Sequence, residues 1–277
     1  MSEDNARIED NSSFFNIIEG EWKQGPQDIR PKVDQLGLVL PIIAADERFR
    51  PLAEALRNIS IYSIFPDTLR EPQKPDPVKP MTEHGGNWSS ILKHLKQEAW
   101  APDLKTALGK ITGDIDDIRV RQVGGYLVTE FRHGVVTNPK GTSEWPKWFE
   151  AAQESDGTLR MAGIITALLQ EPPLTLTGIE EPELTIHPGA IPLLYDYLVE
   201  ASSQSQVLVT THSPELLSLL DVNDVRVVER REGVTSVTQM DESQRNAVRE
   251  RLLTLGDLMR MEGLRQEEPR QTSGTQG

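Results

Sequence analysis

The chain of 277 residues contains no cysteine. This absence excludes a disulfide-stabilised scaffold, a thiolate nucleophile and any zinc or iron–sulfur site built on cysteine ligands. It fits a reducing compartment, where disulfides are rare.

Long apolar runs are also missing. The longest, Leu36–Ala45, is interrupted by Pro41 and is far shorter than the ~20 residues that a membrane-spanning helix needs. The first residues are acidic and polar, which is not the pattern of a secretory signal. We therefore predict a cytoplasmic protein without membrane association.

Basic residues are in the minority, because 29 lysines and arginines face 43 aspartates and glutamates, giving a net charge of −14. This excess argues against a globally basic, nucleic-acid-binding surface. The arginines between Arg226 and Arg270 are interleaved with glutamates, a pattern typical of a solvated face.

Prolines and composition suggest three regions. Glu71–Pro80 holds Pro72, Pro75, Pro77 and Pro80, a density that predicts a loop. We predict a mixed α+β N-terminal lobe over residues 1–150, a core over 151–240, and a C-terminal helix with a disordered tail over 241–277. Within the lobe, we expect a partly exposed lead-in over residues 1 to about 30 with one short helix, and a hairpin that turns at Gly124-Gly125.

Helices and strands alternate in the second half of the chain. This alternation predicts an α/β fold with a parallel sheet. The expected elements are the helix Leu159–Leu169, the strand Leu174–Ile179, the helix Ile191–Ala201, the strand Gln206–Thr210, the helix Pro214–Leu220 and the strand Asp224–Glu229.

Two adjacent carboxylates, Glu180 and Glu181, follow the apolar strand Leu174–Ile179. In an open parallel sheet, ligands bind at the carboxyl ends of the strands. A carboxylate there can hold Mg²⁺ and its neighbour can orient or deprotonate an attacking water. The alternative is an ordinary acidic surface turn after the strand, with Pro182 ending the strand.

His212 lies after the next strand, Gln206–Thr210. Ser213 suits the N-cap of the following helix and Pro214 its first position, so local structure explains both residues. It does not explain His212, whose ring can donate a hydrogen bond to a phosphate oxygen.

The small polar segment Ser155-Asp156-Gly157-Thr158 precedes an apolar helix. A helix N-terminus offers free amides and the positive end of the helix dipole, and both favour phosphate. The alternative is an ordinary capped helix start.

The three segments together, in this order and spacing, resemble the C-terminal half of an ABC-type ATPase head of the RecF/SMC-like branch, a group often described as AAA-type predicted ATPases. Ser155–Thr158 is similar to the signature loop, Ile179–Glu183 to Walker B, Leu184–Pro188 to the D-loop, and His212 to the switch histidine. The resemblance is specific over residues 153–229.

The resemblance implies a P-loop NTPase-like sheet, an ATPase activity, and ATP and Mg²⁺ as cofactors. Glu180 stands at the magnesium carboxylate and Glu181 at the catalytic glutamate, with His212 beside them. Ser155, Gly157 and Thr158 would contact ATP bound by a partner subunit. The implied partners are a second copy or a complementary ATPase subunit, with DNA a partner by resemblance only, in DNA-related maintenance or defence.

The sequence departs from the family pattern in two ways. Walker B normally has an aspartate where Glu180 stands. More importantly, the 277 residues contain no Gly-x-x-x-x-Gly-Lys-Ser/Thr loop, and so no amide cradle or lysine for the phosphates. We expect the first strand to be missing, with the sheet edge beside the Glu180 strand uncovered. ATPase activity is then conditional on a Walker A segment from elsewhere, the chain being a truncated product or half of a split protein.

Two other functions stay open. A degenerate head without catalysis would dock on a complete ATPase subunit and regulate it. A metal hydrolase would instead gather Glu180, Glu181, Glu183 and His187 around a cation, because carboxylates and imidazoles suit divalent metals.

Overall fold

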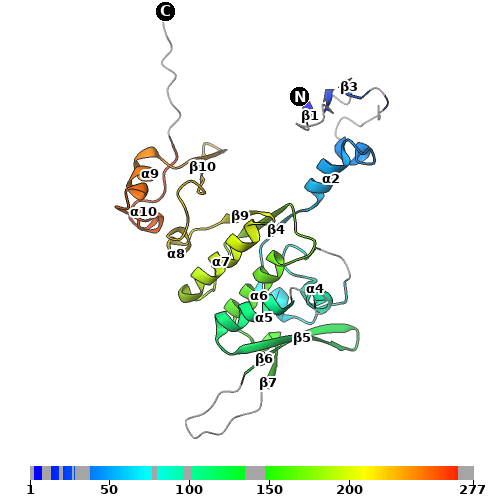
Figure 1. Ribbon diagram of the computed structural model, residues 1–277, viewed down its shortest axis with the longest axis vertical. Coiled ribbons are helices and arrows are strands. Elements are labelled where there is room, and N and C mark those ends of the chain that lie inside the picture. Colours follow the sequence, from blue (N-terminus) through cyan, green and yellow to red (C-terminus); the bar gives the residue numbers. More distant parts are fainter. Residues whose placement is uncertain are drawn as a thin grey trace, which may run out of the picture. The chain divides into compact units, whose positions relative to one another are not determined.

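A computed structural model of the chain describes residues 3–7, 14–18, 21–26, 28, 38–76, 80–95, 101–134 and 147–267 (Figure 1). The predicted disordered tail lies mostly outside these residues. The contacts divide the chain into two compact units, residues 1–60 with 174–176, and residues 61–173 with 177–277. The predicted boundaries at 150 and 240 stay a prediction.

The first unit contains an antiparallel sheet of β1 (Glu3–Arg7), β2 (Phe14–Ile18) and β3 (Glu21–Gln24). The short helix expected within residues 1–30 is not found in the described part of that range, where Phe15 and Ile17 are buried with the period of two that a strand requires. Two helices follow, α1 (Leu40–Ile43) and α2 (Arg50–Arg57). The core of this unit consists of Phe15, Ile17, Val39, Ile43 and Phe49.

A parallel sheet has the strand order β4 (Ile59–Tyr62), β8 (Leu176–Glu180), β9 (Gln206–Thr210). This confirms the predicted α/β class with a parallel sheet. The uncovered edge expected beside the Glu180 strand is wrong, because β8 is the middle strand and β4 pairs with its other side. The pairing joins residues more than a hundred positions apart, and local patterns in the sequence do not report it.

Helix α6 (Asp156–Leu168) is the centre of the helical layer. Every residue from Leu159 to Ala167 is buried, and the helix contacts α3 (Pro66–Arg70), α4 (Trp88–Leu95), α5 (Ala101–Thr112) and α7 (Ile191–Ser202). Figure 1 shows α5, α6 and α7 gathered beside the sheet, with α7 along β9. A helix that is apolar on all sides is held by its neighbours, so its N-terminus is fixed by tertiary packing.

A second sheet, antiparallel, consists of β5 (Ile115–Val123), β6 (Tyr126–His133) and β7 (Lys147–Glu150). The predicted hairpin at Gly124-Gly125 is confirmed as the β5–β6 turn. Trp88 of α4 stacks on Phe131 of β6, with ring centroids 6.2 Å apart, and its Nε1 donates to the hydroxyl of Thr166 in α6 at 3.0 Å. Helix α4 thus joins this sheet to α6.

The last segment contains α8 (Pro214–Leu217), β10 (Val227–Arg231), β11 (Val234–Thr238), α9 (Glu242–Arg249) and α10 (Leu255–Met261). The strand predicted at Asp224–Glu229 exists in part, but its expected place in the parallel sheet is wrong. β10 pairs with β11 in an antiparallel hairpin that turns at Glu232-Gly233, where both residues have positive φ.

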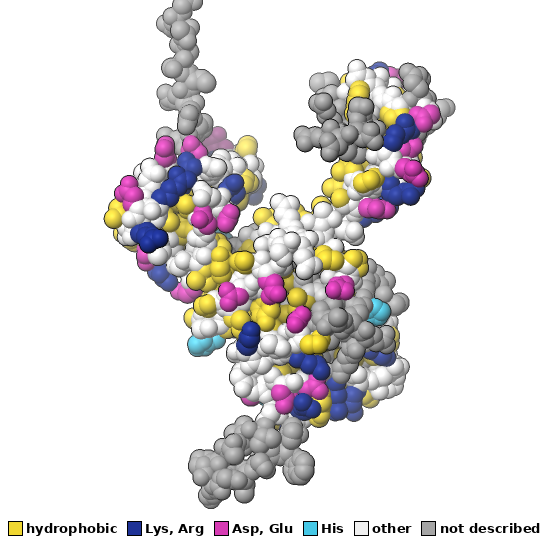
Figure 2. Space-filling view, viewed as in Figure 1, with side chains coloured by type: hydrophobic (Ala, Val, Ile, Leu, Met, Phe, Trp, Pro, Cys, Tyr) yellow, Lys and Arg dark blue, Asp and Glu magenta, His cyan; other side chains and the backbone are white. Residues whose placement is uncertain are grey.

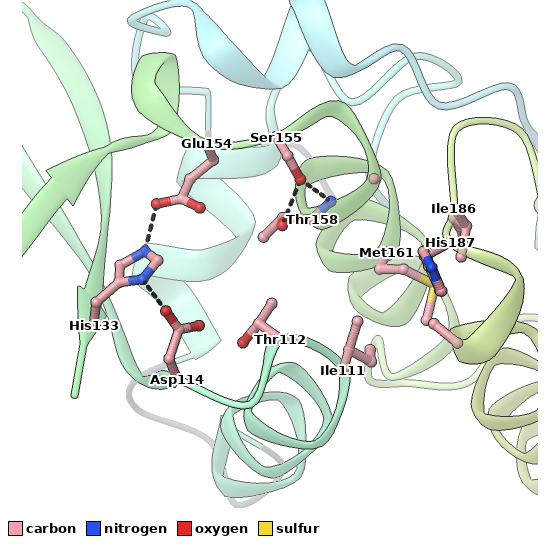
Figure 3. A pocket seen from close by; sticks show the side chains of 12 residues that line it. Ile111, Thr112, Asp114, His133, Glu154, Ser155, Thr158, Met161, Ile186 and His187 are labelled. Atoms are coloured by element: carbon pink, nitrogen blue, oxygen red, sulfur yellow. Dashed lines mark hydrogen bonds and ion pairs between the residues drawn. The ribbon is translucent and has the colours of Figure 1, made fainter. Parts of the chain in front are cut away.

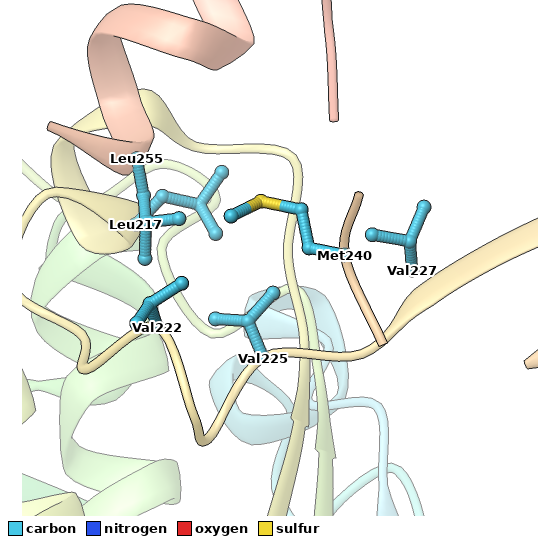
Figure 4. Packing of buried hydrophobic residues seen from close by; sticks show 6 residues of the cluster. All are labelled: Leu217, Val222, Val225, Val227, Met240 and Leu255. Carbon is cyan, nitrogen blue, oxygen red and sulfur yellow. The ribbon is translucent and has the colours of Figure 1, made fainter. Parts of the chain in front are cut away.

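A separate apolar cluster supports this segment (Figure 4). Leu217, Val222, Val225, Val227, Met240 and Leu255 are its buried members. Several arginines of this segment are paired with acidic neighbours, including Arg260 with Glu215 and Arg231 with Glu229. Figure 2 shows the two charges intermixed on the visible face, as expected of a solvated surface. None of the helices in the described ranges combines the length and apolarity that crossing a bilayer requires.

The cluster predicts a contrast between two leucines. Leu255→Ala removes a side chain that is 1% exposed and is expected to cost about 2–5 kcal/mol. Leu252→Ala removes one that is 70% exposed and should change the free energy of unfolding by less than about 0.5 kcal/mol. Hydrogen exchange of the α8 and α10 amides measures both; equal effects of the two substitutions would contradict the packing described.

Candidate functional site

The ends of β8 and β9 lie side by side. Glu180 is the last residue of β8 and is exposed. The amide of the next residue, Glu181, donates to the carbonyl of Thr210 at 2.9 Å and approaches its hydroxyl at 3.3 Å. Glu181 has φ +40°, a left-handed conformation that non-glycine residues rarely adopt. Surrounding contacts must therefore hold it.

Glu183 provides one of these contacts. Its Oε1 accepts hydrogen bonds from the hydroxyl of Thr211 at 2.5 Å and from the amides of His212 and Ser213 at 3.3 and 3.2 Å. Hydrogen bonds to an ionised carboxylate are stronger than neutral ones. Glu183 thus fixes the segment after β9 to the turn after β8.

Arg160 of α6 provides the second contact. Its Nη2 donates to the carbonyl of Glu181 at 3.3 Å, and the residue is only 5% exposed. Burial lowers its pKa, while the charges of Glu183 and Glu181 act in the opposite direction. Nε of Arg160 and Oε2 of Glu183 are buried without a hydrogen-bond partner in the described part of the chain.

Three predicted site residues have unengaged side chains. The carboxylates of Glu180 and Glu181 and the ring of His212 form no hydrogen bond or ion pair with the described residues. Their neighbours Thr210, Thr211, Glu183 and Ser213 are all engaged. An exposed, unpaired carboxylate such as Glu180 suits Mg²⁺, which binds one or two carboxylates and keeps several waters.

The predicted signature-like loop begins α6. Ser155 is the N-cap, and its Oγ accepts from the amide of Thr158 at 3.1 Å. Arg70 of α3 fixes the same loop by donating to the carboxylate of Asp156 at 2.5 Å.

Gly157 lets this loop approach the turn after β8. A Cβ at Gly157 would lie 2.7 Å from the carbonyl oxygen of Thr185, closer than real Cβ contacts allow. Thr185 is itself in the left-handed region, with φ +63°. The N-terminus of α6 is therefore packed directly on the D-loop-like segment, and only glycine fits there.

A cavity of about 280 Å³ lies beside the same loop (Figure 3). Ser155, Gly157 and Thr158 line one part of it, and His133 and His187 line others. Glu180, Glu181 and His212 do not line it. The structure thus brings together the ends of β8 and β9, but gives Ser155, Gly157 and Thr158 a cavity of their own.

The geometry does not favour the metal-hydrolase alternative. Glu183 is engaged with the segment after β9, and Nδ1 of His187 accepts from the amide of Gly189 at 3.0 Å. Across the described ranges, no three His, Asp or Glu side chains are grouped closely enough to hold a metal ion by themselves.

Sequence reasoning missed Arg160 and the group around His133. An arginine between Leu159 and Met161, on an otherwise apolar helix, was an available signal, because a buried cation requires a partner. His133 and its partners Asp114 and Glu154 come from three separate segments, and no local pattern links them.

A family model described as "AAA domain, putative AbiEii toxin, Type IV TA system" matches residues 101–218, less than half of the chain. The match runs from α5 to the end of α8 and contains every predicted site residue. It confirms the resemblance to AAA-type ATPases over that segment. No curated protein matches the chain.

Among solved structures, SMC head domains are similar in fold. One, from work on ATP-driven dimerization and DNA-stimulated activation of SMC ATPases, is 16% identical with a TM-score of 0.42, covering 57% of this chain and 94% of that one. An Smc head domain with a coiled coil and joint from Pyrococcus yayanosii is 16% identical with a TM-score of 0.42, and the match covers 57% of this chain and 30% of that one. An Smc head domain from Pyrococcus furiosus, bound to the C-terminal domain of ScpA, is 15% identical with a TM-score of 0.41, and the match covers 57% of this chain and 39% of that one. The chain therefore spans less than half the length of these two Pyrococcus chains.

The contact at Gly157 makes a prediction about stability. Alanine normally stabilises a helix relative to glycine, by up to about 1 kcal/mol. Gly157→Ala is expected to destabilise instead, by about 1–3 kcal/mol, because the methyl group must displace the Thr185 carbonyl. Gly125→Ala is the matched control, since nothing lies within 4 Å of its added Cβ. Urea unfolding of both variants measures the effect, and a stabilised Gly157→Ala would contradict the contact.

Proposed function

We propose that the chain is the Walker B- and signature-bearing part of an ATP-hydrolysing head. The observation that carries this proposal is the selective availability of side chains at the ends of β8 and β9. Glu180, Glu181 and His212 are unengaged, while the polar residues around them are held in place. The AAA family match over residues 101–218 supports the same reaction class.

Each residue has a role in this proposal. Glu180 is the carboxylate for a magnesium ion, which when bound supplies positive charge to the transferring phosphoryl group. Glu181 orients and deprotonates the attacking water, and His212 donates a hydrogen bond to the γ-phosphate. Ser155, Gly157 and Thr158 present the N-terminus of α6 to the phosphate of a nucleotide bound by a partner subunit.

The phosphate loop must come from outside these 277 residues, because they contain no Gly-Lys-Ser/Thr sequence. The partner in this proposal is therefore a second copy that carries such a loop or a complementary ATPase subunit. The family resemblance further suggests a cytoplasmic role in DNA-related maintenance or defence. Stimulation of hydrolysis by added DNA would test that role separately.

A non-catalytic docking module is the second candidate, and the same missing loop favours it. The two candidates differ in how the isolated chain and its native assembly respond to nucleotide. A ligand that binds only the folded state raises the melting temperature. A clear rise in the melting temperature of the isolated chain with Mg-ATP would contradict the docking module. The absence of a rise both in the isolated chain and in its native assembly would contradict the ATPase.

Glu181→Gln tests catalysis directly. In the native assembly purified through this chain, it is expected to lower kcat for ATP by about 10²–10⁴, the usual contribution of a general base, with ATP still bound. Glu200→Gln, an exposed residue of α7, is the matched control and should leave the rate unchanged. Hydrolysis by Glu181→Gln at the wild-type rate would overturn the assigned role.

A further inference from the structure

His133 is held between two carboxylates from different segments. Its Nδ1 lies 2.8 Å from Oδ2 of Asp114, in the turn between α5 and β5. Its Nε2 lies 2.8 Å from Oε1 of Glu154, which follows the short 3₁₀ helix Ala151–Gln153. Figure 3 shows all three side chains at one side of the cavity that Ser155 and Thr158 also line.

This geometry specifies the protonation state of the ring. An ionised carboxylate only accepts hydrogen bonds, so each ring nitrogen must carry a proton when both carboxyls are ionised. The ring is then an imidazolium. Burial alone would lower the pKa of His133, but the hydrogen bonds to Asp114 and Glu154 outweigh burial and raise it above 6.5.

Glu154 transmits this interaction to the signature-like loop. Its side chain is only 6% exposed, and it directly precedes Ser155. The carbonyl of Glu154 also accepts from Nη2 of Arg70 at 3.4 Å, and Arg70 binds Asp156 on the other side of Ser155. Two cations therefore anchor the loop. Arg70 is always charged, whereas the charge of a histidine depends on pH.

We propose that the doubly protonated ring of His133 is a positioning group for the Ser155–Thr158 loop, and that loss of one proton loosens that loop. The positioning stands on the geometry alone; its consequence for ATP rests on the proposed function. Without the second proton, the ring can donate to only one of the two carboxylates, so the bridge between Asp114 and Glu154 is broken and one carboxylate loses its partner.

Other charged groups around His133 do not replace this contact. Lys147 lies opposite His133 in the β6–β7 ladder, Asp116 lies near the next residue, Gly134, and His187 lines the cavity. Phe149 of β7 packs its ring edge-on against the imidazole, with centroids 5.0 Å apart. Within the described residues, the side chain of Glu154 has no hydrogen-bond partner other than His133.

The direction of the pH effect follows from the raised pKa. The contribution of His133 is complete below the ordinary histidine pKa of 6.5 and is lost as pH rises through the raised value. The protection of the amides of residues 155–158 against hydrogen exchange, corrected for intrinsic rates, should therefore fall with rising pH. The protection factor of these amides should fall about tenfold for each pH unit by which the pKa of His133 exceeds its ordinary value.

Two measurements on the full chain test the proposal without ATP. In nitrogen NMR of histidine-labelled protein, the ring of His133 should show two protonated nitrogens at pH 6.5 and lose the second proton only above the ordinary histidine pKa. The comparison residue is His84, whose Nδ1 contacts the carbonyl of Ser63 and whose Nε2 lies 3.9 Å from Oε1 of Glu83. His133→Gln should lower amide protection in the loop at pH 6 and remove its pH dependence. His84→Gln is the control and should change neither.

Glu154→Gln separates positioning from a general structural role. An amide can donate to a neutral ring, so this variant should keep the loop protected while removing the pH dependence. A singly protonated His133 at pH 6.5, or the same pH profile in wild type and His133→Gln, would overturn the inference. Because neither readout involves nucleotide, a failure here is distinguishable from a failure of Glu181→Gln to affect hydrolysis.

Discussion

Oε1 of Glu183 accepts hydrogen bonds from the hydroxyl of Thr211 and the amides of His212 and Ser213, and the geometry of the candidate site depends on these bonds. Glu183 lies three residues beyond the end of β8, and these bonds connect the turn after β8 to the segment after β9. A carboxylate so engaged is a structural group. Its neighbours Glu180 and Glu181 and the ring of His212 are thereby held at one end of the sheet with their side-chain polar atoms unengaged, and the proposed function rests on this arrangement.

Helix α6 connects this sheet end to the rest of the unit. It is buried on all sides from Leu159 to Ala167, so neighbouring helices fix its position. Arg160 reaches the carbonyl of Glu181, and Gly157 permits contact with Thr185. A movement of the α6 N-terminus must therefore displace the turn that holds Glu181. The chain has a direct route between the loop proposed to contact one nucleotide and the carboxylates proposed to act on another.

Local patterns predicted most of the elements near the site. The strand Gln206–Thr210 and the β5–β6 hairpin follow from alternation and from Gly124-Gly125, and Ser155 and Ser213 are N-caps as their positions suggest. The errors concern partners. Alternation of helices and strands predicts β10 in the parallel sheet, but β11, which follows directly after Glu232-Gly233, pairs with it instead. Within residues 1–30, where a short helix is expected, the buried Phe15 and Ile17 keep the period of two that distinguishes a strand from a helix.

The sequence by itself determined the α/β class, the order of the three motifs and the candidate residues Glu180, Glu181 and His212, because strand ends, caps and acidic pairs are local features of the chain. Only the tertiary structure decided that β4 pairs with β8, that Glu183 is an anchor, and that His133 joins Asp114 to Glu154. These contacts unite segments distant in the chain. Their free energy comes from burial and charge pairing that exist only after the chain has folded, so no local pattern encodes them.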